Sequence, residues 1–162
     1  MDRIILWSFF ISGLALLFFI LRKPLIKERK PIIKDTILVF LLKAYLSTYI
    51  GIFVATEKMI EYPVRFLSKY FETNIIFESF LYPIMCVYFF QTTYHSKFLG
   101  IVLQCALYTA ALTIIEVLCE KYTDLIKYHT WTWMHSFITI FLLSLFVRML
   151  MQWMNKIDES KA

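Results

Sequence analysis

Long apolar stretches alternate with short charged segments along the whole chain. A helix rises 1.5 Å per residue, so a stretch of about 20 apolar residues crosses the hydrocarbon core of a bilayer. Five stretches meet or approach this length, at about residues 4–21, 36–55, 74–92, 98–118 and 131–151. The pattern therefore predicts an all-α fold, a five-helix transmembrane bundle that forms a single membrane domain over residues 1–162.

Two segments depart from this alternation. Residues 57–73 mix charged and apolar side chains, and Pro63 interrupts any helix there. We expect a short interfacial amphipathic segment between the second and third spans. The other segment is the basic linker 22–35, which follows the first span where a secretory signal would show small residues for cleavage. We therefore expect the first span to remain in the protein.

The basic linker also predicts the orientation. Its positive side chains are Arg22, Lys23, Lys27, Arg29, Lys30 and Lys34. Cytoplasmic loops of membrane proteins carry an excess of Lys and Arg, and placing this linker inside puts the larger share of the basic residues there. The predicted topology has the N-terminus outside and the C-terminus in the cytoplasm.

Composition supports a membrane protein and changes little else. The chain is 60% hydrophobic, whereas soluble domains average about 45–50%. Its net charge of +5 is explained by the loop bias, so we expect a lipid bilayer and no nucleic acid as partner. Cys86, Cys105 and Cys119 lie in or at the end of apolar stretches without metal-ligand spacing. We expect buried thiols, no metal and no cofactor.

One charge lies inside a predicted span. Lys43 shares a helical face with Ser47 and Gly51, at spacings of four residues, and this face should pack against protein. Two interpretations remain open for Lys43. Its side chain either extends to the nearby membrane surface or forms a buried ion pair.

A polar cluster forms where three predicted spans begin or end. Glu78 lies near the start of the third span, and Glu116 and Glu120 close the fourth, on the helical face that also carries Thr109 and Thr113. The fifth span opens with two tryptophans and a histidine, Trp131, Trp133 and His135. In the predicted topology all six lie at the outer level of the membrane, where they would line one pocket.

Three interpretations compete for this cluster. Tryptophans and charges mark membrane interfaces, and carboxylates can pair with His135 to fix a bundle. The third is a chemical site in which a carboxylate acts as a base, binds a cation or ligates a metal with His135. The sequence contains no HExxH, GxSxG or glycine-rich phosphate loop. An enzyme is therefore the less favoured interpretation, although it stays open.

Several runs carry a resemblance to a known family. They are the residues Ile115–Thr123 (IEVLCEKYT), Lys127–Trp133 (KYHTWTW), Tyr62–Leu67 (YPVRFL) and Gln91–Tyr94 (QTTY). Through them, residues 35–155 resemble a family of small multi-pass membrane proteins of spore-forming Firmicutes, which has no assigned biochemical activity. The resemblance implies a helical membrane fold and a bacterial plasma membrane, and it carries over no site residues.

Three functions follow from these patterns. The leading hypothesis is a non-enzymatic accessory or interaction subunit that binds a membrane-protein partner or a second copy of itself. The first alternative is a small transporter or channel component that uses Lys43, Glu78 and Glu116. The second is a membrane enzyme that acts on a lipid at the outer leaflet.

Overall fold

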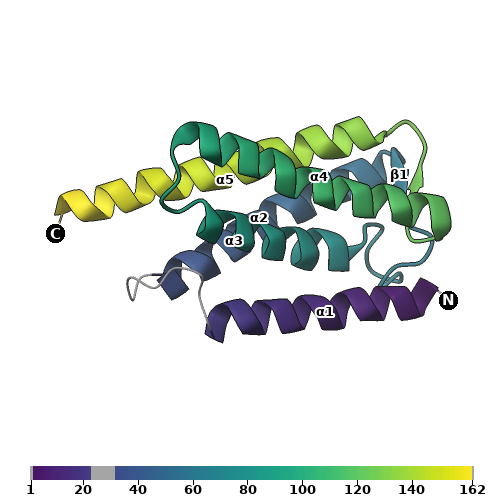
Figure 1. The fold of residues 1–162 in the computed structure, drawn as a ribbon. Helices are drawn as coiled ribbons and strands as arrows, with labels where there is room; N and C mark the ends of the chain where they lie inside the picture. The colour runs from purple at the N-terminus through teal and green to yellow at the C-terminus, as the bar shows by residue number, and fades with distance from the viewer. Residues whose placement is uncertain (1, 23–31, 162) are drawn as a thin grey trace.

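The computed structural model describes residues 2–22 and 32–161, which form a bundle of roughly aligned helices (Figure 1). Four long helices are α1 (Asp2–Arg22), α2 (Ile32–Thr56), α4 (Phe98–Tyr122) and α5 (Trp133–Lys161). A shorter fifth helix consists of a π-helical turn, η1 (Phe77–Leu81), that continues into α3 (Tyr82–Thr92). Most of the predicted basic linker lies outside the described residues.

The predicted all-α bundle of five helices is confirmed. The four long helices are each long and apolar enough to cross a membrane, so the architecture is that of a membrane-embedded protein. The helix at the predicted third span differs, because its first turn is wound as a π-helix. Pro83 lacks an N–H and cannot donate the backbone hydrogen bond of a regular α-helix, and the wider turn lies directly before it.

Helix α3 is the centre of the bundle. Eight of its eleven residues are buried, whereas only 17% of the apolar stretch of α1 that could cross a membrane is buried. Helices α2 and η1 pack on α3. Helices α4 and α5 pack on each other, and α1 lies along one side of the bundle, against η1 and α3. The helix with the π-turn is therefore held by its neighbours rather than by lipid.

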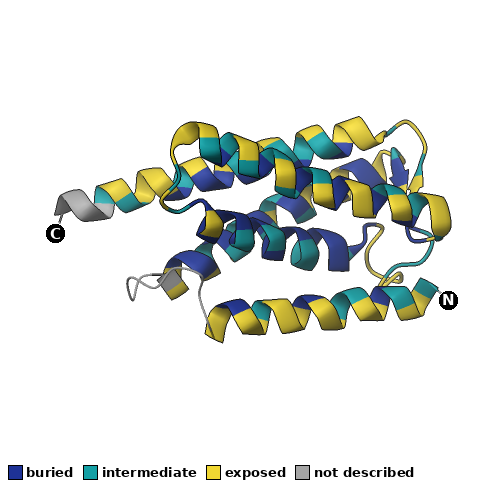
Figure 2. Ribbon diagram, viewed as in Figure 1, coloured by how far each residue is buried: buried dark blue, intermediate teal, exposed yellow. Residues whose placement is uncertain are grey.

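Figure 2 marks the buried and the exposed residues of the bundle. Many of the exposed residues are large and apolar, whereas several of the buried ones are polar. Exposed side chains of α4 include Leu103 and Leu107, whereas Thr109, Thr113 and Glu116 of the same helix are buried. A soluble helix shows the opposite distribution, and polar residues in membrane helices usually face protein. The helices are thus oriented as expected for a bundle surrounded by lipid.

The segment 57–73 forms a cap at one end of the bundle and contains no helix. Strand β1 (Ile60–Glu61) pairs with β2 (Lys127–Tyr128), which lies in the loop between α4 and α5. The Val64 N–H also donates to the Asp124 carbonyl, at 3.2 Å. The predicted interfacial segment is therefore joined to the α4–α5 loop, and the two loops close the end of the bundle near the N-terminus.

Candidate functional site

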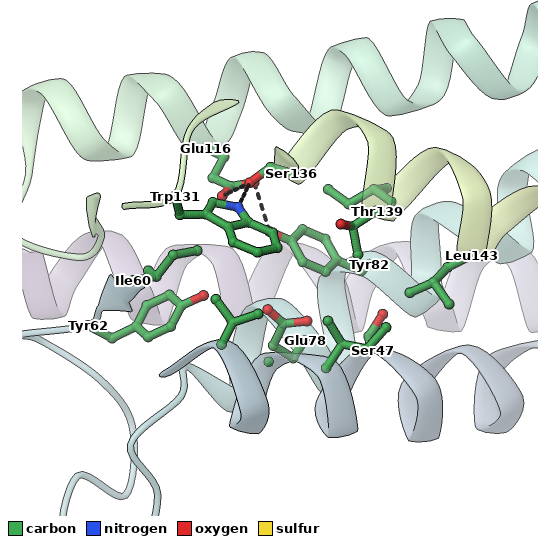
Figure 3. A pocket seen from close by; sticks show the side chains of 14 residues that line it. Ser47, Ile60, Tyr62, Glu78, Tyr82, Glu116, Trp131, Ser136, Thr139 and Leu143 are labelled. Carbon is green, nitrogen blue, oxygen red and sulfur yellow. Dashed lines mark hydrogen bonds between the residues drawn. The ribbon is translucent and has the colours of Figure 1, made fainter. Parts of the chain in front are cut away.

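Glu116 is the centre of a buried hydrogen-bond network. Its side chain is 3% exposed, and its Oε1 atom accepts hydrogen bonds from the hydroxyls of Ser136, at 2.7 Å, and Tyr128, at 2.9 Å. The Oε2 atom accepts one from the Tyr82 hydroxyl, at 3.2 Å. The Trp131 indole N–H donates to Ser136 at 2.8 Å (Figure 3). One carboxylate thus connects α4 to α3, β2 and α5.

Glu78 projects from the π-turn toward α2. Its side chain is 8% exposed, and it occupies the space left by the absent side chain of Gly51. A Cβ atom on Gly51 would lie 2.7 Å from the Glu78 Cγ atom, closer than real contacts allow. The predicted packing of the Lys43, Ser47 and Gly51 face against protein is confirmed, and Glu78 is part of what it packs against.

The two carboxylates line the same cavity. It has an empty volume of about 410 Å³, of which about 40 Å³ is open to the centres of water molecules. That is room for roughly two or three waters or one small ion with a water. Its walls carry hydroxyls on Ser47, Tyr62, Tyr82, Ser136 and Thr139. Its remaining walls are Gly51 and apolar or aromatic side chains, namely Ile50, Val54, Ile60, Trp131, Ile140 and Leu143.

Two tyrosines from the cap reach this site: Tyr62 lines the cavity and Tyr128 donates a hydrogen bond to Glu116. Burial, with the nearby Glu78 and Glu116 carboxylates, raises the pKa of Tyr62 well above its usual range. Burial and Glu116 likewise raise the pKa of Tyr128. Both phenols therefore keep their protons at physiological pH.

Lys43 lies in the interior beside this cavity, one helical turn from Ser47. It is 0% exposed, so the interpretation that it extends to the membrane surface is wrong. Glu78 is near enough to interact with it electrostatically, as are the thiols of Cys86 and Cys105. In the described part of the chain, however, the Lys43 ammonium has no hydrogen-bond partner. The other interpretation, a buried ion pair, is not shown either, because no hydrogen bond to a carboxylate of the described residues closes it.

The predicted cluster is only partly brought together. Glu78, Glu116 and Trp131 line the cavity, and Glu120 is half-buried one turn beyond it. Trp133 is 55% exposed on the outer face of the bundle. The predictions that Glu120 and Trp133 share the pocket are wrong.

His135 also lies outside the cavity. It is exposed, its ring lies 5.2 Å from that of Trp131, and its Nδ1 atom lies 2.7 Å from the Thr132 hydroxyl. Among the described residues, no three His, Cys, Asp or Glu side chains are grouped as metal ligands. The arrangement of His135 therefore does not match a metal site shared with Glu116.

A second, polar pocket lies next to the cavity. Its empty volume is about 690 Å³, and its charged lining consists of Lys58, Glu61, Arg65, Glu72 and His129. The His129 Nε2 atom lies 3.2 Å from the Glu61 Oε2 atom, across the β1–β2 pair. Ile60 and Tyr62 line both spaces and form the wall between them. We call this space the cap pocket.

Comparison of the chain with protein-family models, curated proteins and solved structures found no match. The interpretation of the site therefore depends on its own geometry.

Proposed function

We propose that the protein is a non-enzymatic membrane subunit that binds one monovalent cation at Glu78 and Glu116 and takes part in its transport. The observation that carries this proposal is the cavity itself. Two carboxylates from η1 and α4 line one buried space of water size, surrounded by hydroxyl groups. Oxygen atoms of this kind are the usual ligands of small hard cations, and they also accept hydrogen bonds from ammonium groups.

The balance of buried charge favours a single positive ligand. With Glu78, Glu116 and Lys43 ionised, the interior around the cavity has a net charge of −1. Among the described residues, two further charged side chains are buried. Arg148 lies against the α3–α4 turn at the opposite end of the bundle, and Asp35 of α2 accepts a hydrogen bond from Asn155 of α5. A net charge is costly in a medium of low dielectric constant, and one monovalent cation removes it. Without the cation, a proton on Glu78 removes the same net charge.

The hydrogen bonds of Glu116 favour binding over catalysis. Three fixed donors point at this carboxylate and stabilise its charged form. A general base must be free to take a proton from a substrate, whereas a cation ligand only has to remain an anion. The surroundings of Glu116 therefore favour a cation ligand over the general base of a lipid-modifying enzyme.

The predicted topology places the cap pocket at the outer surface of a bacterial plasma membrane. A cation would then enter from outside, through the wall formed by Ile60 and Tyr62. Five helices are few for an alternating-access transporter. We therefore place the chain in a complex, with a membrane-protein partner or further copies of itself, which retains the interaction role predicted from the sequence.

Cation-dependent stability of the purified protein tests the proposal. The melting temperature is measured by circular dichroism while Na⁺, K⁺, ammonium or methylammonium is varied at constant ionic strength. A ligand that binds only the folded state stabilises it by about 2.7 kcal/mol at 100 times its Kd, so a shift of several degrees is expected for the preferred cation. The shift should shrink as the pH falls, because protons compete for Glu78.

Three variants assign any shift to the cavity. Glu78→Gln and Glu116→Gln should each abolish the shift. If the loss of the Glu116 network prevents folding, Glu78→Gln alone tests the assignment. Glu120→Gln is the matched control, one turn along the same helix and outside the cavity. Equal shifts in all three variants, or none in the unaltered protein, would overturn the proposal. If the cations bind but none of them crosses the membrane of reconstituted vesicles, transport by the chain alone is excluded.

A further inference from the structure

An apolar groove runs between α1 and α4 on the side of the bundle. Its empty volume is about 620 Å³, and its lining includes Ser12 and Leu16 from α1 and Leu112 and Ile115 from α4. Helix α1 packs against η1 and α3, and the groove lies between these elements and α4. We call it the α1–α4 groove.

The α1–α4 groove and the carboxylate cavity share a wall. Tyr82 and Glu116 line both spaces, so the groove leads from the side of the bundle to the buried site. In an otherwise apolar groove these are the polar side chains at the inner end. The cavity therefore borders two spaces of opposite character, the charged cap pocket and this apolar groove.

Glu116 has room for one more hydrogen bond. Its Oε1 atom accepts two, from Ser136 and Tyr128, whereas Oε2 accepts only one, the longest of the three, from Tyr82. A carboxylate oxygen can accept two hydrogen bonds. Within the described residues, Oε2 thus retains a free acceptor position. A plain hydrocarbon chain in the groove would leave this acceptor unsatisfied.

From this geometry we propose that the cation is the protonated amine of a membrane-dissolved amphiphile, whose single apolar chain lies in the α1–α4 groove while its head reaches Glu116. The inference rests on the cation site proposed above and names its ligand class. With Glu78, Glu116 and Lys43 ionised, the net charge of −1 around the cavity favours a positive head. A phosphate or carboxylate head would place a second anion against Glu116, with like-charge repulsion in a medium of low dielectric constant.

Matched amphiphiles test the ligand class. The full chain is placed in lipid nanodiscs, and its melting temperature is followed as dodecylammonium, dodecanol or dodecanoate is added at equal mole fraction in the lipid. Expressing the dose in the lipid removes differences in partitioning. Dodecylammonium should raise the melting temperature by several degrees, and the neutral and anionic compounds should not.

Two serines of α1 provide a matched pair for the groove. Ser8 and Ser12 are both exposed, one turn apart, and each hydroxyl donates to the carbonyl three residues earlier. Only Ser12 lines the groove. Ser12→Trp should fill the groove. The dodecylammonium dose that gives half the shift in melting temperature should then rise by at least about tenfold, on the order expected for a blocked site. Ser8→Trp should leave that dose unchanged.

Methylammonium separates this inference from the proposed function. It has the same head without a chain, so both serine variants should respond to it as the unaltered protein does. A methylammonium response without a dodecylammonium response would overturn the inference and leave the cation site. Equal effects of Ser8→Trp and Ser12→Trp on the dodecylammonium dose, or a response to dodecanol as large as to dodecylammonium, would also overturn it. No response to any cation would overturn both.

Discussion

Two regions of the bundle each bury a positive charge, and they treat it differently. At the end formed by the α3–α4 turn, Arg148 of α5 is 4% exposed. Its guanidinium donates to the Thr93 hydroxyl at 3.1 Å and to the carbonyls of Thr93 and Tyr94 at 2.9 and 3.3 Å, and it lies 5.3 Å from the centre of the Phe90 ring. Protein groups thus complete the surroundings of this charge.

Lys43 has no such set of partners. It is more deeply buried than Arg148, yet its ammonium has no hydrogen bond to the described residues, and it lies beside a cavity with two carboxylates. Burial of a charge in a membrane helix is therefore not enough to mark a site. The distinguishing property is an incomplete set of partners next to an open space. Arg148 is structural by this criterion, and the region around Lys43 has room for a ligand.

The largest expected effect comes from removing the completed charge. Arg148→Met removes the guanidinium donor from the Thr93 hydroxyl and the Tyr94 carbonyl, because Met cannot donate, and it leaves the Thr93 carbonyl with the Ser96 N–H alone. We expect a loss of about 3 kcal/mol in the free energy of unfolding, the usual size for breaking a buried charged network. Unfolding of the detergent-solubilised protein by dodecyl sulfate measures it. The control is Lys97→Met, which removes an exposed charge near the same turn and should change stability little.

A smaller effect is expected where Gly51 makes room for Glu78. In Gly51→Ala the new methyl group meets the Glu78 side chain at 2.7–2.8 Å, so the carboxylate must move. We expect a destabilisation of about 1 to 2 kcal/mol, as for overpacking of a filled interior. Gly100→Ala is the control, since its nearest neighbour would be at 3.5 Å, an ordinary contact.

A double-mutant cycle identifies the cause of the Gly51 effect. If Glu78 is the obstacle, Gly51→Ala should cost at least about 1 kcal/mol less in a Glu78→Ala background. The same cost in both backgrounds would show that the methyl group disturbs something other than the carboxylate.

Much of the fold could be predicted because lipid imposes a simple rule on each span. Apolar runs longer than the bilayer become helices, and four observed helices contain the predicted ranges or nearly all of them. The form of the helix at the third span was harder to predict, because it depends on Glu78, Pro83 and their neighbours rather than on hydropathy. The cap could not be predicted, since the pairing of Ile60 with Tyr128 joins segments far apart in the sequence.

The site residues could be predicted where the spacing along one helix showed which face is buried. They could not be predicted where the rotation of a helix about its axis determined which residues face the site. Glu116 lies on the Thr109–Thr113 face, which is buried as predicted. In α5 the buried residues Ser136, Ile140, Ser144 and Arg148 follow one another at intervals of four. That spacing turns Trp133 and His135 outward. This polar stripe was visible in the sequence, and it was the signal that could have identified Ser136 in place of His135.

The smallest expected effect separates Lys43 from Arg148. Lys43→Met replaces a buried ammonium, which has no hydrogen-bond partner among residues 2–22 and 32–161, by an apolar side chain of similar length. No donor or acceptor of these residues loses a hydrogen bond, the cost of burying the ammonium disappears, and the electrostatic attraction to Glu78 is lost. The two terms oppose each other, so we expect the free energy of unfolding to change by less than about 1 kcal/mol, or to rise. The same dodecyl sulfate titration measures both variants. A loss as large as that of Arg148→Met would mean that Lys43 is held by partners as Arg148 is, and the contrast between the two regions would fail.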